Sequence, residues 1–138
     1  KNSSIVFEDN ISIGQNLHII SGGEQELRIG RDTTFSANVF MTNIDHKYDE
    51  INKHILEQSL VNSKTQIGEN CFIGYGAVIQ AGTILGKQCI VGANSVVRGT
   101  FPDYSVIVGT PARVVKRYDE KSKKWKKTNN KGEFLDEK

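Results

Sequence analysis

Three histidines are the residues of this 138-residue chain best suited to acid–base or metal chemistry. An imidazole changes its protonation near neutral pH, so a positioned histidine can take a proton from a reacting hydroxyl. His18, His46 and His54 could in principle also hold zinc together. His18 falls on an expected strand, however, and His54 within an expected loop, so we expect no metal site. For His46, an exposed loop histidine without a task stays an alternative to a general base.

The composition indicates that strands must position these residues. Ile and Val together number 26, whereas Leu is 6 and Ala is 5. β-Branched side chains suit a pleated sheet and lose rotamer freedom in a helix. Because 37% of the residues are apolar, wholesale disorder is excluded, and no apolar run approaches the roughly 20 residues of a membrane span. A single β-rich domain is therefore expected.

Cysteine content and charge narrow the function classes. Two cysteines do not form a disulfide framework, so we expect a reducing compartment such as the cytoplasm. Residues 1–110 carry 8 basic against 11 acidic side chains, whereas residues 111–138 carry 10 against 5. The body lacks the basic face typical of nucleic-acid domains. We expect no nucleic-acid partner and at most peripheral membrane contact.

A six-residue repeat organises residues 67–102, which read IGENCF, IGYGAV, IQAGTI, LGKQCI, VGANSV and VRGTFP. Six residues do not match the 3.6-residue period of an α-helix, so each hexad is better interpreted as a short strand and a turn. The small fifth residue and the aliphatic first residue of the next hexad lie two apart and point inward. Gly at the second position serves the turn. Three hexads then form one triangular coil, and the chain forms a parallel β-helix of about four to five coils.

The register predicts which residues stack and where the coils are interrupted. The three inner rows are Phe7, Ile29, Ile67 and Leu85; Ile13, Phe35, Ile73 and Val91; and Ile19, Met41, Ile79 and Val97. This alignment needs insertions after Ile19 and after Met41, and the pattern breaks again after Val97, all at one corner. The longest insertion is an excursion loop over residues 42–66. Since loops held by a rigid scaffold often carry function, this corner is the expected site.

Outward positions predict contacts with other copies of the chain. In the late coils they are all apolar: Phe72, Val78, Ile84, Ile90 and Val96. An exposed apolar wall is a liability in a monomer, and two such faces fit a closed homotrimer. Cys71 and Cys89 are eighteen residues apart, one full coil, and we expect them to stack as two buried thiols rather than as a disulfide.

The hexads, the excursion NIDHKYDEINKHI and the ending VGANSVVRGTFPDYSVIVGTPARVVK resemble the hexapeptide-repeat acyltransferases. More narrowly, they resemble the galactoside, maltose and lipopolysaccharide O-antigen O-acetyltransferases. The resemblance implies an all-β fold, a left-handed parallel β-helix, over residues 1–117. The remaining residues 118–138 are expected to be a basic C-terminal tail, with a short helix over 118–127 around Trp125 and disorder over 128–138.

The same resemblance implies an acetyl-CoA-dependent enzyme with sites between subunits of a homotrimer. It places a general base at His46, and Asp45 is a candidate to orient the imidazole. The positions matching the family's contacts with the pantetheine of the coenzyme are Phe72, Tyr75, Gly76, Ala93, Arg98 and Gly99, with plain coil turns as the alternative. Arg113 and Lys116 follow the Gly109-Thr110-Pro111-Ala112 turn and would meet the phosphates of the nucleotide, with solvated tail charge as the alternative.

The acceptor is expected to be a sugar hydroxyl of a surface polysaccharide or its precursor. Glu24, Asn43 and Tyr48 are the candidate acceptor contacts, with solvated loop residues as the alternative for each. Another small acceptor (a free sugar, serine or an antibiotic) and a non-enzymatic β-helical scaffold stay open as alternative functions. The charged 47–66 segment departs from the family at Lys53-His54-Ile55, where Lys-Pro-Ile is common, so the loop can run differently.

Overall fold

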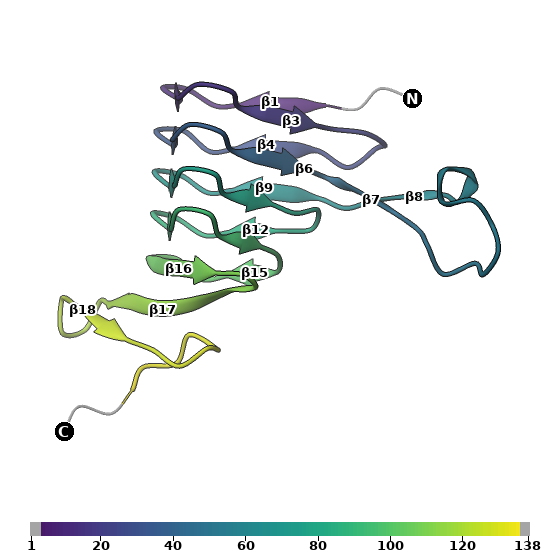
Figure 1. Ribbon diagram of the computed structural model, residues 1–138. Coiled ribbons are helices and arrows are strands. Elements are labelled where there is room, and N and C mark those ends of the chain that lie inside the picture. Colours follow the sequence, from purple (N-terminus) through teal and green to yellow (C-terminus); the bar gives the residue numbers. More distant parts are fainter. Residues whose placement is uncertain (1–3, 136–138) are drawn as a thin grey trace.

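A computed structural model describes residues 4–135 as stacked triangular coils (Figure 1). Three parallel sheets form the sides of the prism, an arrangement typical of a left-handed β-helix. Sheet A contains β1 (Ile5–Phe7), β4 (Leu27–Ile29), β9 (Thr65–Ile67), β12 (Ile84–Leu85) and β15 (Thr100–Phe101). Sheet B begins with β2 (Ser12–Ile13), β5 (Thr34–Phe35), β10 (Phe72–Ile73) and β13 (Ile90–Val91), and sheet C contains β3 (His18–Ile20), β6 (Phe40–Thr42), β11 (Val78–Ile79) and β14 (Val96–Val97).

The predicted inner rows are confirmed by the strand register. Ile29 pairs with Phe7 on one side and with Ile67 on the other, and Ile67 pairs with Leu85. The other two rows follow the predicted order as well. The first positions of the late hexads are fully or almost fully buried: Ile67, Ile73, Ile79, Leu85, Val91 and Val97. From the second coil onward these rows form the core of the prism, whereas Phe7 and Ile13 of the first coil keep the register but are exposed.

The second-position glycines have a different role from the one predicted. The left-handed backbone conformation of each turn lies two residues later, as at Asn70 with φ of 55°. Gly68 is instead required by the stacking of the coils, because an added Cβ would lie 2.5 Å from the carbonyl oxygen of Gly86 in the next coil. The glycine therefore allows two turns to approach each other.

The two cysteines lie buried and free in the core, as predicted. Each thiol donates to a backbone carbonyl of the next turn: Cys71 Sγ to Gly86 O at 3.2 Å and Cys89 Sγ to Pro102 O at 3.3 Å. The neighbouring Cys89 thiol and burial both raise the pKa of Cys71 above its ordinary value. These groups act as small core residues, in line with their place in the repeat.

The predicted C-terminal helix is wrong, whereas the predicted break in the hexad pattern after Val97 interrupts the spacing without ending the coils. Phe101 continues the sheet A row by pairing with Leu85. Beyond it, sheet B is extended by β16 (Ser105–Gly109), β17 (Ala112–Asp119) and β18 (Lys124–Lys127), the last two antiparallel. A strand forms because Ala112 and Val114 alternate with exposed residues and find a pairing edge in β16. β17 runs across the expected domain boundary at residues 117/118.

The segment after β18 also differs from the expected disorder. Thr128 forms an isolated bridge with Phe134, and the Asn129 carboxamide oxygen accepts from the amides of Lys131 and Glu133. The Arg117 guanidinium lies 5.4 Å from the centre of the Phe134 ring. Residues 128–135 are therefore packed on the hairpin, and residues 136–138 lie outside the described part of the chain. Within residues 4–135, no helix is long and apolar enough to cross a membrane.

Candidate active site

The site is built at the corner where the chain passes from sheet C to sheet A, here called the C–A corner. The segment 21–26 and the excursion leave the prism there, and residues 98–99 form the short turn from β14 to β15 at the same corner. The excursion itself spans 43–64, because Thr42 still belongs to β6 and Thr65 already belongs to β9. It contains β7 (Ile44–His46), the 3-10 helix η1 (Ile55–Glu57) and β8 (Leu60–Asn62), and it projects away from the coils (Figure 1).

Asn43 fixes the excursion to the prism where β7 begins. Its side chain is fully buried. The carboxamide oxygen accepts from the Gly22 amide at 2.9 Å, and the nitrogen donates to Gln25 O at 2.8 Å and to Ser21 Oγ at 3.1 Å. At the returning end, Asn62 accepts from the Gln25 amide and donates to Asn43 O at 3.1 Å. Both ends of the excursion are thus bonded to the preceding coil.

His46, the last residue of β7, is exposed and lines a hollow of about 590 Å³. The other lining residues are Asp45, Lys47, Tyr48, Asp49, Val61 and Arg98. β7 and β8 pair antiparallel, with His46 opposite Leu60. The imidazole therefore lies beside an open cavity between the excursion and the wall of the coils. A hydroxyl group bound in this cavity could give its proton to the imidazole.

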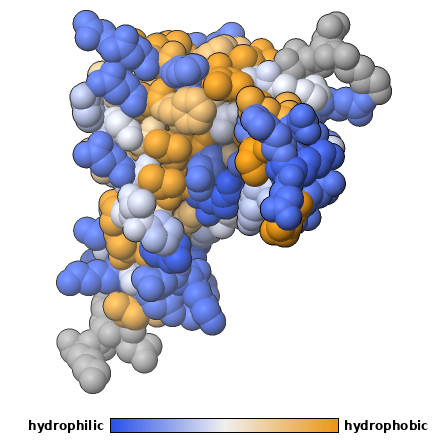
Figure 2. Space-filling view, turned by 45° about the vertical axis from the view of Figure 1, so that its right-hand side comes forward, coloured by the Kyte–Doolittle hydropathy of each residue, from blue (hydrophilic) through white to orange (hydrophobic). Residues whose placement is uncertain are grey.

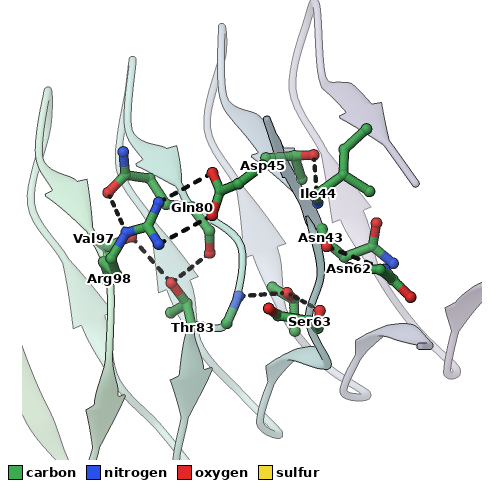
Figure 3. Close-up of polar contacts among 12 residues, drawn as sticks. Asn43, Ile44, Asp45, Asn62, Ser63, Gln80, Thr83, Val97 and Arg98 are labelled. Atoms are coloured by element: carbon green, nitrogen blue, oxygen red, sulfur yellow. Dashed lines mark hydrogen bonds and ion pairs between the residues drawn. The ribbon is translucent and has the colours of Figure 1, made fainter. Parts of the chain in front are cut away.

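The Asp45 carboxylate contacts Arg98 of the coils rather than the imidazole of His46. The carboxylate forms a two-pronged ion pair with Arg98, with Nη1–Oδ2 at 3.1 Å and Nη2–Oδ1 at 3.2 Å (Figure 3). The Arg98 Nε donates to Gln80 Oε1 at 3.2 Å. Adjacent side chains on a strand point in opposite directions, which explains why Asp45 contacts the coil rather than His46.

The predicted coenzyme residues fall into two groups. Arg98 and Gly99 lie at the C–A corner beside His46. Tyr75, Gly76 and Ala93 lie at the next corner, the B–C corner, where the turns after β10 and β13 stack and Asn94 N donates to Tyr75 O at 2.7 Å. Phe72 lies on the outer face of sheet B and is 42% exposed. The structure does not bring these positions into one cluster on a single copy.

Arg113 and Lys116 lie on β17, opposite Val108 and Val106 of β16, on the outer side of sheet B. The pairing of β17 with β18 places Lys127 directly opposite Lys116, and paired residues share a face. Sequence reasoning missed Lys127 because it expected a helix there. The two lysines and Arg113 form a basic edge at the end of the prism.

The candidate acceptor residues differ in accessibility. Asn43 does not suit the predicted acceptor contact. Its carboxamide is buried and anchors the excursion, so a ligand has no access to it. Tyr48 is 77% exposed and lines the hollow with His46. Glu24 is exposed in the 21–26 segment at the same corner. Only Tyr48 is thus placed directly at the cavity.

The other two histidines are used elsewhere. The His18 ring packs edge-on against Phe40, with the centres 5.3 Å apart. His54 Nδ1 accepts from the Leu56 amide at 3.1 Å and caps η1. Among residues 4–135, no group of three His, Cys, Asp or Glu side chains is arranged to hold a metal ion.

The predicted outward positions do reach the surface. Phe72 is exposed, and Val78, Ile84, Ile90 and Val96 are half-buried. Phe40 extends this apolar set, since it pairs with Val78 on sheet C. Figure 2 shows apolar surface on the outside of the coils, next to the mainly polar excursion. On sheet A, by contrast, Ile84 stands between Gln66 and Thr100.

The stacked hexads, the three parallel sheets and the single projecting excursion define a hexapeptide-repeat β-helix protein. The family model "Bacterial transferase hexapeptide (six repeats)" matches residues 64–99. The chain belongs to the hexapeptide-repeat acetyltransferase family, which confirms the resemblance seen in the sequence.

Among individual proteins, the chain is 35% identical over 133 residues to the putative lipopolysaccharide biosynthesis O-acetyl transferase WbbJ of Escherichia coli K12. That alignment covers 89% of this chain and 65% of the relative. The chain spans less than two thirds of the length of the curated relatives it matches.

Solved structures that share the fold include two acetyltransferases. A maltose O-acetyltransferase from Clostridium difficile 630 has a TM-score of 0.60 and 27% identity, over 85% of this chain and 68% of that one. The hexapeptide-repeat-containing acetyltransferase VCA0836 of Vibrio cholerae, complexed with acetyl-coenzyme A, has a TM-score of 0.62 and 20% identity, over 86% of this chain and 69% of that one.

Proposed function

We propose that this protein is an O-acetyltransferase that moves an acetyl group from acetyl-CoA to a sugar hydroxyl of a surface polysaccharide or its precursor. The observation that carries the proposal is the exposed His46 imidazole beside the hollow at the root of the excursion. The similarity to a lipopolysaccharide O-acetyl transferase and to a maltose O-acetyltransferase supports both the reaction and the acceptor class.

The reaction proceeds by direct attack. His46 accepts the proton of the sugar hydroxyl while its oxygen attacks the thioester carbonyl, forming a tetrahedral oxyanion. The oxyanion collapses with cleavage of the carbon–sulfur bond, and the proton passes from the imidazolium to the departing sulfur of coenzyme A. The products are the acetyl ester and the free thiol, and no covalent enzyme intermediate forms.

The basic edge formed by Arg113, Lys116 and Lys127 suits the phosphates of the coenzyme. Lys116 and Lys127 lie directly opposite each other and carry like charges, and a bound anion would reduce the repulsion between them. At the B–C corner, Ala93 carries a small side chain, which suits a ligand along the stacked turns, whereas the space beside Gly76 holds the side chain of Asn94. These residues fit acetyl-CoA as the acyl donor, and the acetyl-CoA complex of a protein with the same fold supports this donor.

The separation of the two residue groups supports a site shared between copies. His46 lies at the C–A corner, whereas Tyr75, Gly76 and Ala93 lie at the B–C corner of the same prism. In a homotrimer, one copy supplies His46 and its neighbour supplies the groove for the coenzyme. The apolar outer faces of sheets B and C, which include Phe72 and Val78, are then covered. Light scattering should give about 46 kDa, three times the 15.4 kDa of one chain.

The decisive variant is His46→Ala. With acetyl-CoA and a sugar acceptor, kcat should fall by about 10²–10⁴ while the oligomeric mass is unchanged. The matched control is His54→Ala, which removes the other excursion histidine and should leave kcat within about twofold of the parent because His54 caps η1 away from the hollow. Parent-like turnover in His46→Ala would refute the assignment of the base.

Two assays separate the alternative functions. An acceptor panel of oligosaccharides, free sugars, serine and aminoglycosides, with release of the CoA thiol as the signal, distinguishes a polysaccharide acetyltransferase from an enzyme with another small acceptor. A non-enzymatic scaffold would show no thermal shift with acetyl-CoA, whereas a true site raises the midpoint of unfolding as the concentration increases.

A further inference from the structure

The Asp45–Arg98 ion pair joins the excursion to a coil that is distant in the sequence. Arg98 follows β14 on the wall of the prism, and Asp45 is the middle residue of β7. The guanidinium donates a hydrogen bond to each carboxylate oxygen, at 3.1 and 3.2 Å (Figure 3). This fork-to-carboxylate geometry fixes direction as well as distance, which a point charge does not.

Arg98 is itself held from the side of the coil. Its Nε donates to the side-chain oxygen of Gln80, one coil away, at 3.2 Å. Three of its N–H groups are therefore directed by Asp45 and Gln80. Since a guanidinium has five N–H donors and three of them are engaged, the arrangement disfavours the coenzyme contact expected for Arg98 from the sequence.

The hairpin that carries His46 needs such a tether. β7 and β8 contain three residues each and pair only with each other outside the prism. An isolated two-stranded hairpin is marginal in water. Asn43 and Asn62 fix the hairpin where its two strands meet the prism, but both of these contacts lie at its base. The ion pair of Asp45, two residues beyond Asn43 and adjacent to His46, adds a contact to the coils further along the strand.

We propose that Asp45 and Arg98 form a positioning pair that sets the orientation of the His46 imidazole over the hollow. This inference rests on the proposed function of His46 as general base. Asp45 and Arg98 do not exchange protons with the substrate. Together with Asn43 they fix the direction of β7 relative to the coils, and a misplacement of about 1 Å at a catalytic group lowers turnover by about 10²-fold.

The test compares Asp45→Asn, Arg98→Gln and the double variant with the parent. Each single variant should lower kcat by about 10- to 100-fold, with KM for acetyl-CoA within about twofold of the parent. The double variant should lose no more than the worse single variant, because both remove the same contact. Arg98→Lys should recover only part of kcat, since an ammonium keeps the charge and loses the fork.

The matched control is Arg31→Gln, which breaks another exposed arginine–carboxylate pair, that of Arg31 with Glu69, away from the hollow. Its kcat should match the parent. Asp45 and Arg98 are both partly exposed, so their variants should fold, and the oligomeric mass verifies this. If Arg98→Gln raises KM for acetyl-CoA while Asp45→Asn keeps parent kinetics, Arg98 binds the coenzyme and the inference is overturned.

The same substitution made in the His46→Ala variant distinguishes a failure of this inference from a failure of the proposed function. In His46→Ala, adding Arg98→Gln should cause no further loss of kcat, because the residue being positioned is absent. A full additional loss would show that Arg98 acts independently of His46 and would overturn the inference. Should His46→Ala keep the parent rate, the proposed base fails as well. Should His46→Ala lose activity while Asp45→Asn and Arg98→Gln keep the parent kcat, only the positioning pair fails.

Discussion

Asn43→Ala should destabilise the protein and loosen the excursion that carries His46. The parent side chain is fully buried and makes three hydrogen bonds, with Gly22, Ser21 and Gln25. A typical hydrogen bond contributes about 0.5–1.5 kcal/mol, and a buried group left without its partner costs about 1–3 kcal/mol. Because Gln25 is exposed and Gly22 is half-buried, water can replace part of the loss. We therefore expect a decrease of about 1.5–3 kcal/mol in the free energy of unfolding.

Two measurements follow this change. Urea unfolding gives the loss of global stability, and limited proteolysis reports opening of residues 43–64, which should be cut faster in the variant. Turnover should fall with KM for acetyl-CoA little changed, because the displaced group is His46 rather than the coenzyme groove. Gln66→Ala, which truncates a half-buried amide on the outer face of β9, is the control and should change stability by less than about 0.5 kcal/mol. An Asn43→Ala variant with parent stability and parent proteolysis would refute the anchoring role.

Two further predictions concern the coils and the C-terminal hairpin. Gly68→Ala should lower the free energy of unfolding by about 1–3 kcal/mol in urea, because its Cβ would meet the backbone of Gly86; a stability equal to the parent would contradict the close stacking. Asp119→Asn should be less stable than the parent at pH 7. The Lys126 ammonium at 2.8 Å holds the pKa of Asp119 at about 2, below its ordinary value of 3.8. The stabilisation is therefore present above about pH 4 and is lost as the pH falls through about 2. Unfolding curves at pH 7, 4 and 2 should show the two proteins converging in acid, and a difference independent of pH would count against the ion pair.

The coils could be predicted from the sequence because their signal is periodic. Each inner row repeats a residue type at a fixed spacing, so Ile67 and Leu85 could be aligned without knowing the fold of the excursion. The same alignment placed the insertions, and hence His46, at one corner. These predictions depend on local spacing and on the burial of apolar side chains, both of which are visible in a single sequence.

The contacts of the site could not be predicted because they join distant segments. Asp45 and Arg98 are 53 residues apart, and their pairing depends on the direction in which β7 leaves the prism. Asn43 lies next to a charged loop and looks like a surface residue, yet it is buried. The tail was mispredicted for a related reason: its lysines favoured a helix over 118–127, whereas the free edge of β17 selected a strand for Lys124–Lys127.

The excursion divides into a fixed root and a free tip, and this division bears on how acceptors are chosen. At the root, Asn43 and Asp45 are bonded to coils that cannot shift without disturbing the core. At the tip, Ile51 is 84% exposed and Leu56 is 74% exposed. Since His46 lies at the root, changes at the tip should alter the acceptor that is bound while leaving proton transfer in place. A rigid prism with one projecting loop can therefore keep its chemistry constant while its acceptor varies.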